Sequence, residues 1–208
     1  AEAMGKDVKD LKIVSCHLGN GSSITAVDGG KSVDTSMGFT PLDGVVMGTR
    51  TGAVDPSAVT FVADKHGFTP AQMSEYMNKK SGFLGVSGVG SDNRDIQEAA
   101  NHGNKRAELV SEMLTYEIKK YIGSYAAAMN GIDAILFTGG IGENSWEVRE
   151  AVCEDMDYFG IKIDKELNRS IRGKLTKLST PDSKIEVWIV PTNEELLIAR
   201  DTLELISK

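Results

Sequence analysis

The stretch DAILFTGGIGENSWEVREAV, residues 133–152, contains the pattern that decides the fold. Its first part, DAILFT, is an apolar run with the length of a buried strand, and its last part, WEVREAV, spaces apolar residues as a helix does. Apolar residues on both faces of a strand are typical of a sheet that helices cover on both sides. We therefore expect a strand, a glycine-rich turn and a helix within an α/β domain.

The connection between these elements, TGGIGENS at 138–145, contains the pattern G-G-x-G. Each glycine lowers stability by roughly 0.5–1 kcal/mol relative to alanine, because it loses more backbone entropy on folding. Two interpretations stay open. The glycines make a tight strand-to-helix turn, or they let a nucleotide approach the main chain at the carboxyl end of a strand. The pattern is neither G-x-G-x-x-G nor a phosphate loop, so it does not decide between them.

The same alternation of strand and helix recurs at the other end of the chain. KIEVWIVP, residues 184–191, is predicted as a strand, and ELLIARDTLELIS, residues 195–207, as a helix. Thr192 and Glu195 have the spacing of a capping box, with Glu195 as the capping glutamate. No Pro/Ser-rich linker divides the sequence, so we expect one domain with a mixed β-sheet flanked by helices.

Residues 12–36 are predicted to form an antiparallel meander of three short strands, broken by turns at 18–21 and 28–30. Helices follow from their start and stop signals. One begins after Asp55 and ends at Gly67, and the next begins after Thr69 and ends near Lys79. The glycine-rich segment 81–92 is predicted as a flexible loop, and residues 105–130 as a long amphipathic helix that Gly131 stops.

Composition excludes several classes of function. The chain has 208 residues, 40% of them hydrophobic, which suffices for a large core. It has 23 basic and 30 acidic residues and a net charge of −7 without a basic cluster, so nucleic acid is not an expected partner. No apolar run approaches the ~20 residues that span a bilayer, and the first residues do not resemble a signal peptide. We expect no membrane association and a cytoplasmic location.

The two cysteines and three histidines do not have metal-site spacing. Cys16 and Cys153 are interpreted as small, reduced core residues. His17 adjoins the first hairpin turn, whereas His66 and His102 lie near predicted helix ends. We therefore do not expect a transition-metal site built from these side chains.

Several polar residues next to the glycine-rich segments have both a structural and a functional interpretation. Asn20 and Gly21 form a strong hairpin signal, but such a tip with free amides and two serines can also hold phosphate oxygens. Arg50, in MGTRTG, is either a solvated charge or a planar group for a phosphoryl or carboxylate. Asp92 and Arg94 can form a helix cap and its surface partner. Glu194 is favoured by a helix dipole whatever else it does.

Read together, these motifs resemble the acetokinase family. HLGNGSSITAV, TSMGFTPLDGVVMGTRTGAVDP, NKKSGFLGVSG, DNRD, FTGGIGENS and PTNEELLIARDT occur in the family's order and spacing, over nearly the whole chain. The family includes acetate, propionate and butyrate kinases, and it belongs with sugar kinases, actin and heat-shock chaperones. The resemblance implies an actin-like, sugar-kinase-like (ribonuclease H-like) fold, and reversible transfer of the γ-phosphoryl of ATP to acetate, giving acetyl phosphate and ADP.

The resemblance also implies roles for individual positions. Arg50 matches an arginine assigned to transition-state stabilisation, and Glu194 matches a glutamate linked to Mg²⁺. The remaining positions match family segments that contact ATP or ADP. The segment that contacts the phosphates matches His17, Leu18, Gly19, Asn20 and Gly21, and a second segment that contacts the nucleotide matches Asp92, Asn93 and Arg94. The segment that lines the adenosine pocket matches Gly140, Ile141, Gly142, Glu143 and Asn144.

One large departure from the family pattern limits what is expected of the chain. Family members begin with an amino-terminal domain that carries an acetate pocket, a catalytic aspartate and an H-G-T-S-H segment, and the sequence given starts after the positions that match these. Residues 1–208 therefore look like the carboxyl-terminal nucleotide-binding domain. Alone, it is expected to bind ADP or ATP with Mg²⁺, more weakly than the complete enzyme does, and to be essentially inactive. The family also implies a homodimer.

Two alternatives to an enzyme half stay open. A stand-alone module of the same superfamily would use ATP as a conformational ligand only, and an upstream H-G-T-S-H segment in the same reading frame would exclude it. If the glycines serve only turns, ATP would not raise the melting temperature. The sequence does not separate acetate from propionate, because the family's acyl pocket lies in the other domain.

Overall fold

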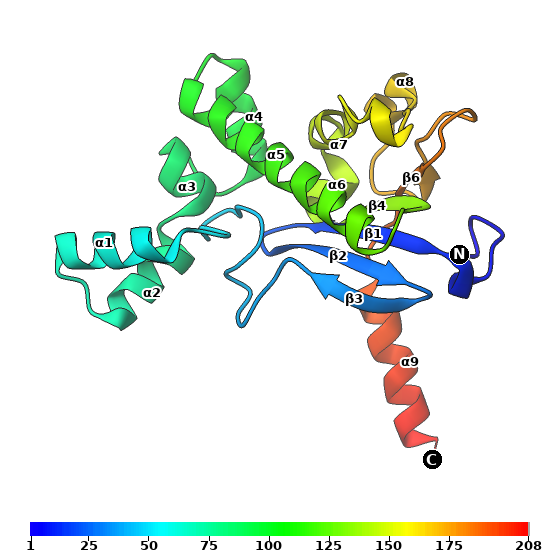
Figure 1. The fold of residues 1–208 in the computed structure, drawn as a ribbon, viewed down its shortest axis with the longest axis horizontal. Coiled ribbons are helices and arrows are strands. Elements are labelled where there is room, and N and C mark those ends of the chain that lie inside the picture. Colours follow the sequence, from blue (N-terminus) through cyan, green and yellow to red (C-terminus); the bar gives the residue numbers. More distant parts are fainter. Residues whose placement is uncertain (208) are drawn as a thin grey trace.

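A six-stranded sheet forms the centre of the molecule, shown in Figure 1. The structure is a computed structural model that describes residues 1–207, with the side chain of Glu194 outside the description. The strands are β1 (Lys12–Leu18), β2 (Ser22–Asp28), β3 (Lys31–Thr35), β4 (Ala134–Thr138), β5 (Thr176–Lys177) and β6 (Glu186–Ile189). They lie in the order β3-β2-β1-β4-β6-β5.

The sheet is mixed, as the sequence predicts. β1 pairs antiparallel with β2 and β2 with β3, which confirms the meander over 12–36. β1 and β6 each pair parallel with β4, and β5 returns antiparallel to β6. Because β1 and β4 run in the same direction, their carboxyl ends meet at one edge, where the hairpin tip and the G-G-x-G segment lie together.

Helices account for most of the remaining chain. They are α1 (Pro56–His66), α2 (Pro70–Lys79), α3 (Gly82–Ser87), α4 (Asn93–Asn101), α5 (Lys105–Ala128), α6 (Gly139–Asn144), α7 (Trp146–Cys153), α8 (Lys165–Ser170) and α9 (Glu194–Ile206), with short 3₁₀ turns η1 (Val8–Asp10) and η2 (Asp157–Phe159). The predicted caps of α1 and α2 are confirmed. The Asp55 side chain accepts from the Ser57 amide, and Thr69 forms a capping box with Gln72.

The predicted flexible loop over 81–92 is wrong in its first half, because α3 occupies Gly82–Ser87. Glycine does not prevent a helix when tertiary contacts define it. The Phe83 side chain is 2% exposed, and its amide donates to the Met47 carbonyl at 2.9 Å. Gly82 itself has φ of +62°, and a Cβ there would overlap the Met47 carbonyl oxygen. Glycine at this position therefore permits a close contact between two segments.

Two predicted helix ends also differ. The cap of α9 is Asn193, whose side chain accepts from the Leu196 amide, and not the predicted pair of Thr192 and Glu195. Thr192 does not cap α9 because its hydroxyl is bonded to Thr138 at 2.7 Å. After α5, the chain already turns at Asn130, with φ of +55°, before Gly131.

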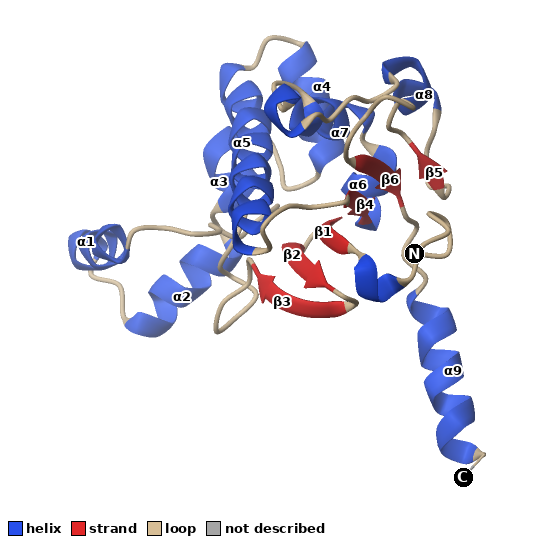
Figure 2. Cartoon of the chain, turned by 45° about the vertical axis from the view of Figure 1, so that its right-hand side comes forward, coloured by secondary structure: helices blue, strands red, loops and turns tan. Residues whose placement is uncertain are grey.

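The main core lies between one face of the sheet and α5, α3 and α7. Ile135 and Phe137 of β4 join this core, whereas Ala134 and Leu136 face a small cluster that includes Met4 near the amino terminus. The prediction of helices on both faces is wrong for the described residues. Figures 1 and 2 show α5 and its neighbours on one face, whereas α9 points away from the sheet and α1 and α2 form a separate arm.

Cys16 and Cys153 are both buried, which confirms their interpretation as core residues. Burial raises the pKa of each thiol, that of Cys153 to about 12. Both groups are therefore neutral at physiological pH. Among the described residues, the helices are too short or too polar for any of them to span a bilayer.

Candidate functional site

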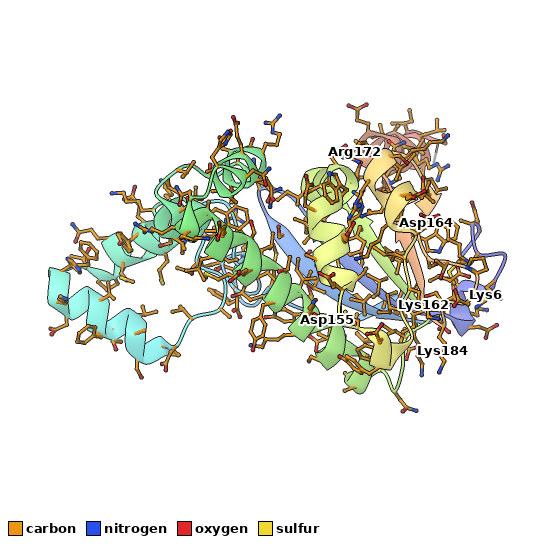
Figure 3. All side chains as sticks on the ribbon, turned by 90° about the horizontal axis from the view of Figure 1, so that it is seen from above. Lys6, Asp155, Lys162, Asp164, Arg172 and Lys184 are labelled. Carbon is orange, nitrogen blue, oxygen red and sulfur yellow. The ribbon has the colours of Figure 1, made fainter. Side chains whose placement is uncertain are left out.

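A pocket of about 920 Å³ opens beside the carboxyl ends of β1 and β4. Residues from four parts of the chain form its walls: the β1–β2 hairpin tip, the segment from α3 to α4, the α6–α7 segment, and Arg172 after α8. Figure 3 labels Arg172 among the side chains of the molecule. Its lining includes eight of the positions singled out from the sequence: Gly19, Asn20, Asp92, Asn93, Arg94, Gly140, Ile141 and Asn144. Three widely separated motifs thus face one cavity.

The hairpin tip is fixed by its own side chains. The Ser22 hydroxyl accepts from the Gly19 amide at 3.2 Å and donates to the Gly19 carbonyl at 3.1 Å. Asn20 is exposed at the tip, and Leu18 directs a fully buried side chain into the core. Of the expected phosphate-contacting residues, Leu18 can therefore offer a ligand only its main chain, whereas Asn20 offers its side chain.

The G-G-x-G segment is helical and not the turn that the sequence predicts, since α6 begins directly at Gly139. Two of its glycines are explained by contacts within the protein. A Cβ on Gly139, where φ is +75°, would lie 2.7 Å from the Leu18 carbonyl oxygen, and one on Gly142 would lie 3.3 Å from the Phe137 carbonyl carbon. Gly140 is different, because a Cβ there would meet no described atom within 4 Å.

Glu143 and Asn144 have different surroundings. Glu143 Oε1 accepts from the amides of Gly139 at 3.0 Å and Thr192 at 2.9 Å, so this carboxylate joins α6 to the segment that leads into α9. The Asn144 amide donates to the Gly140 carbonyl at 2.9 Å and is exposed on the pocket wall. Only Asn144 of the two lines the large pocket.

Arg149, which no sequence motif indicates, connects the segments that form this wall. Its side chain is 0% exposed, and its guanidinium donates to the carbonyls of Gly142 at 2.9 Å, Asn168 at 3.1 Å and Ile171 at 3.3 Å. Its Nε also donates to Asn168 Oδ1 at 2.8 Å. Burial lowers the pKa of Arg149 to about 10, so it stays charged at neutral pH. The arginine links α6 and α8 to the segment that ends at Arg172.

Asp92 and Arg94 form the cap and surface pair that the structural interpretation predicts. Asp92 Oδ1 accepts from the Arg94 amide at 2.8 Å, and the two side chains form a 2.6 Å ion pair. Hydrogen bonds from Arg94 lower the pKa of Asp92 to about 2. Both residues also line the pocket, so their structural role as a helix cap and ion pair is compatible with contact to a ligand there.

Arg50 lies near the hairpin tip and outside the lining of the large pocket. A Cβ on Gly21 would come within 3.2 Å of Arg50 Nη1, so the two motifs are neighbours. The same Nη1 donates to the Pro41 carbonyl at 3.2 Å and to Met47 Sδ at 3.7 Å. Among the described residues, no carboxylate lies within 4.0 Å of this guanidinium. Arg50 is half-buried and braced against its own loop.

A second, open pocket of about 490 Å³ adjoins the first and shares Gly140 with it. It is lined by His17, Gly139, Gly140, Glu143, Thr192, Asn193 and Glu195. Glu194 follows Asn193 as the first residue of α9, but its side chain lies outside the described residues. Within the described part of the chain, no three His, Cys, Asp or Glu side chains are grouped so as to hold a metal ion.

The remaining pocket residues were not found from the sequence. The largest group lies on α4 and its carboxyl end, where Gln97, Glu98, Asn101 and His102 continue the wall that begins at Arg94. Their spacing of three or four residues places them on one helix face, a signal that could have found them once Arg94 was chosen. Phe83, Glu147 and Arg172 have no such signal, since only the tertiary fold brings them to the pocket.

Comparison with known proteins gives consistent results. Residues 1–200 match the model of the acetokinase family. An acetate kinase of Carboxydothermus hydrogenoformans is 56% identical over 206 residues, which are 99% of this chain and 51% of that protein. The crystal structure of Porphyromonas gingivalis acetate kinase superposes with a TM-score of 0.96 at 50% identity, covering 99% of this chain and 51% of that one.

A propionate kinase from Francisella tularensis superposes with a TM-score of 0.87 at 39% identity, covering 96% of this chain and 50% of that one. The chain thus spans about half the length of the relatives that it matches. The superposition on solved acetate kinases confirms the expected fold class.

Proposed function

The chain belongs to the acetokinase family, and from this premise we propose that its large pocket binds ADP or ATP. We propose further that the chain is the carboxyl-terminal, nucleotide-binding half of a kinase that transfers a phosphoryl group reversibly between ATP and acetate. The relatives named acetate kinase support the reaction. The convergence of the hairpin tip, the start of α4 and α6 on one pocket supports the nucleotide.

The nucleotide proposal rests above all on the open space beside Gly140. Gly139 and Gly142 are needed because protein atoms lie where their Cβ atoms would be, but the corresponding space at Gly140 is open. A glycine in a helix is destabilising relative to alanine, so a different reason is needed for its presence. Gly140 lies where the two pockets meet. Close approach of a nucleotide to the backbone at this point supplies that reason.

The other positions receive roles from their places in the site. Asn20 and the amide of Gly21 at the hairpin tip would hold phosphate oxygens. Gly19, whose own amide donates to the Ser22 hydroxyl, would line the pocket beside them, with His17 at the side of the second pocket. Arg50, next to Gly21, would contact the transferring phosphoryl group and neutralise the charge that develops there. Asp92, Asn93 and Arg94 would contact the nucleotide across the pocket.

We propose that Mg²⁺ binds together with the nucleotide. Magnesium in such sites is held mainly by substrate phosphates, with one or two carboxylates from the protein. Glu194 is our candidate for such a carboxylate, because Asn193 and Glu195 on either side of it line the second pocket. The metal would supply charge neutralisation at the phosphates. In the full-length enzyme, Glu194→Gln should raise the Mg²⁺ concentration needed for half-maximal rate, and an unchanged requirement would exclude this role.

The decisive experiment measures ADP affinity by titration calorimetry. Gly140→Ala adds a methyl group to open space, so it should leave the melting temperature unchanged or higher, yet weaken ADP binding about tenfold or more by occupying the space of the ligand. Gly123→Ala, toward the carboxyl end of α5, is the matched control, since Gly123 is also a helical glycine but lies outside the pocket. Equal ADP affinity in both variants would contradict the proposal.

Propionate is a second candidate for the acyl acceptor, because the chain superposes on a propionate kinase as well as on acetate kinases. We propose acetate as the preferred substrate on the strength of the higher identity to acetate kinases. The full-length enzyme decides the question when kcat/KM is measured with both acids. A higher value for propionate would reverse the assignment.

We also propose that the full-length protein is a cytoplasmic homodimer, which rests on the family resemblance alone. A cytoplasmic location would give it the ATP and ADP that the reaction uses. Sedimentation equilibrium at micromolar concentration tests the oligomeric state. A pure monomer would count against the dimer without affecting the proposed reaction.

A further inference from the structure

The loop that contains Arg50 is hydrogen-bonded to two helices, α3 and α5. On one side, the carbonyls of Met47 and Gly48 accept from the amides of Phe83 at 2.9 Å and Leu84 at 3.0 Å, at the start of α3. On the other side, the Val46 amide donates to Glu117 Oε2 of α5 at 2.6 Å. Glu117 thus reaches from the long core helix to a residue four positions before Arg50.

The hydrogen bond to Glu117 satisfies a backbone amide that is buried in the loop. Val46 is 1% exposed, and a buried amide without an acceptor destabilises the fold. Residues 36–55 contain no strand or helix that could pair this amide. A carboxylate is a stronger acceptor than a neutral carbonyl, which fits the short distance.

Glu117 is held in an environment that does not favour its charge. Partial burial raises its pKa, whereas the Val46 amide and Lys120 act in the opposite direction. Burial raises the pKa of Tyr121, one turn further along α5, and the negative charges of Asp43, Glu117 and Asp34 raise it further. A carboxylate in these surroundings needs a hydrogen-bond donor to stabilise it, and the Val46 amide is that donor.

The contact continues from Val46 to Arg50 through Met47. The Met47 amide donates to the Arg50 carbonyl at 3.2 Å, and Met47 Sδ lies 3.7 Å from Arg50 Nη1. Met47 is itself fully buried. A shift of Val46 would therefore move the residue that supports both the backbone and the guanidinium of Arg50.

We propose that Glu117 is a positioning residue, which fixes residues 45–50 from α5 and thereby sets the place of the Arg50 guanidinium. The proposal rests on the role proposed above for Arg50. The described hydrogen-bond partner of Glu117 is the Val46 amide, and the structure shows no contact by which Glu117 would itself take part in the phosphoryl transfer. It acts through the loop alone.

The test compares Glu117→Ala and Glu117→Gln in the full-length enzyme. Alanine removes the acceptor for Val46, whereas glutamine keeps an acceptor oxygen at the same reach and removes only the charge. We expect kcat to fall about 10- to 100-fold in Glu117→Ala, the size of effect that small misplacements of reacting groups produce, with little change in KM for ADP. Glutamine should restore most of kcat.

Asp133→Ala is the matched control, because Asp133 Oδ2 likewise accepts one backbone amide, that of Lys12, at the far end of β1. It should lower the melting temperature without lowering kcat. Amide hydrogen exchange gives a readout that needs no activity, and Glu117→Ala should speed exchange at residues 45–50. If Glu117→Ala does not fold, Glu117→Asp replaces it, since its carboxylate is one methylene too short to reach Val46.

The outcomes separate this inference from the proposed function. Unchanged exchange at 45–50 overturns the anchoring by Glu117. A normal kcat in Glu117→Ala, when Arg50→Ala is impaired, overturns the effect on Arg50. If Arg50→Ala keeps its kcat, the role proposed for Arg50 fails, and the exchange result alone then decides whether Glu117 anchors the loop.

Discussion

Arg149 and Arg50 place their guanidinium groups in two different settings. Arg149 is fully buried, and its donors are bonded to Gly142, Asn168 and Ile171, so it has a structural role behind the pocket wall. Arg50 is half-buried and braced by the Pro41 carbonyl and Met47 sulfur through one nitrogen, Nη1. Arg149 is thus buried with four hydrogen bonds from all three of its nitrogens, which indicates a structural arginine, whereas a half-buried arginine braced through one nitrogen keeps donors that can serve a ligand.

The largest effect expected from this comparison is on catalysis at Arg50. In the full-length enzyme, Arg50→Ala should lower kcat by about 10²–10³-fold, or roughly 2.7–4 kcal/mol, because a preorganised donor to the transferring group is lost. ADP affinity should barely change. Arg50→Lys should restore little, since a point charge does not reproduce a planar contact.

Steady-state kinetics and ADP titration check this prediction together. A kcat of Arg50→Ala within about threefold of the wild-type value would leave Arg50 without a catalytic role. It would also remove the contrast with Arg149, because both arginines would then be structural.

The next effect concerns stability at Arg149. Arg149→Met should lower the free energy of unfolding by roughly 2–4 kcal/mol, because it leaves the buried carbonyls of Gly142, Asn168 and Ile171 without their charged donor. Denaturant unfolding measures the change. Arg169→Met is the control, since Arg169 is also an arginine of this region but is half exposed and paired with Glu150. A smaller loss for Arg149→Met than for the control would contradict the structural role.

The smallest effect is expected at a third guanidinium, the exposed Arg94. Asp92→Asn keeps a good helix cap and removes the ion pair, so stability at pH 7 should fall by about 0.2–1 kcal/mol. Because the folded-state pKa of Asp92 is lowered to about 2 from 3.8, its ion-pair stabilisation is present above 3.8 and disappears as the pH falls toward 2. The difference between the two proteins should shrink over that range, and a constant difference would exclude the ion pair as its cause.

Much of the fold could be predicted from local signals. Alternation and turn residues predicted the meander of β1 to β3, and proline next to a capping residue predicted the starts of α1 and α2. These signals are short-range, because caps and hairpins involve residues within a few positions of each other. The prediction failed at α3, where the helix depends on Phe83 contacting the core and on Met47, far away in the sequence.

The candidate site shows the same division. The sequence alone indicated the hairpin tip, the start of α4 and the G-G-x-G segment, because glycine and capping residues carry a backbone meaning that does not depend on the rest of the chain. It did not indicate Arg149 or Glu117, since an arginine or a glutamate on a helix is ordinarily solvated. Only the tertiary structure decides that Arg149 is buried and that Glu117 faces the Val46 amide, because burial and partners are set by segments brought together from distant parts of the sequence.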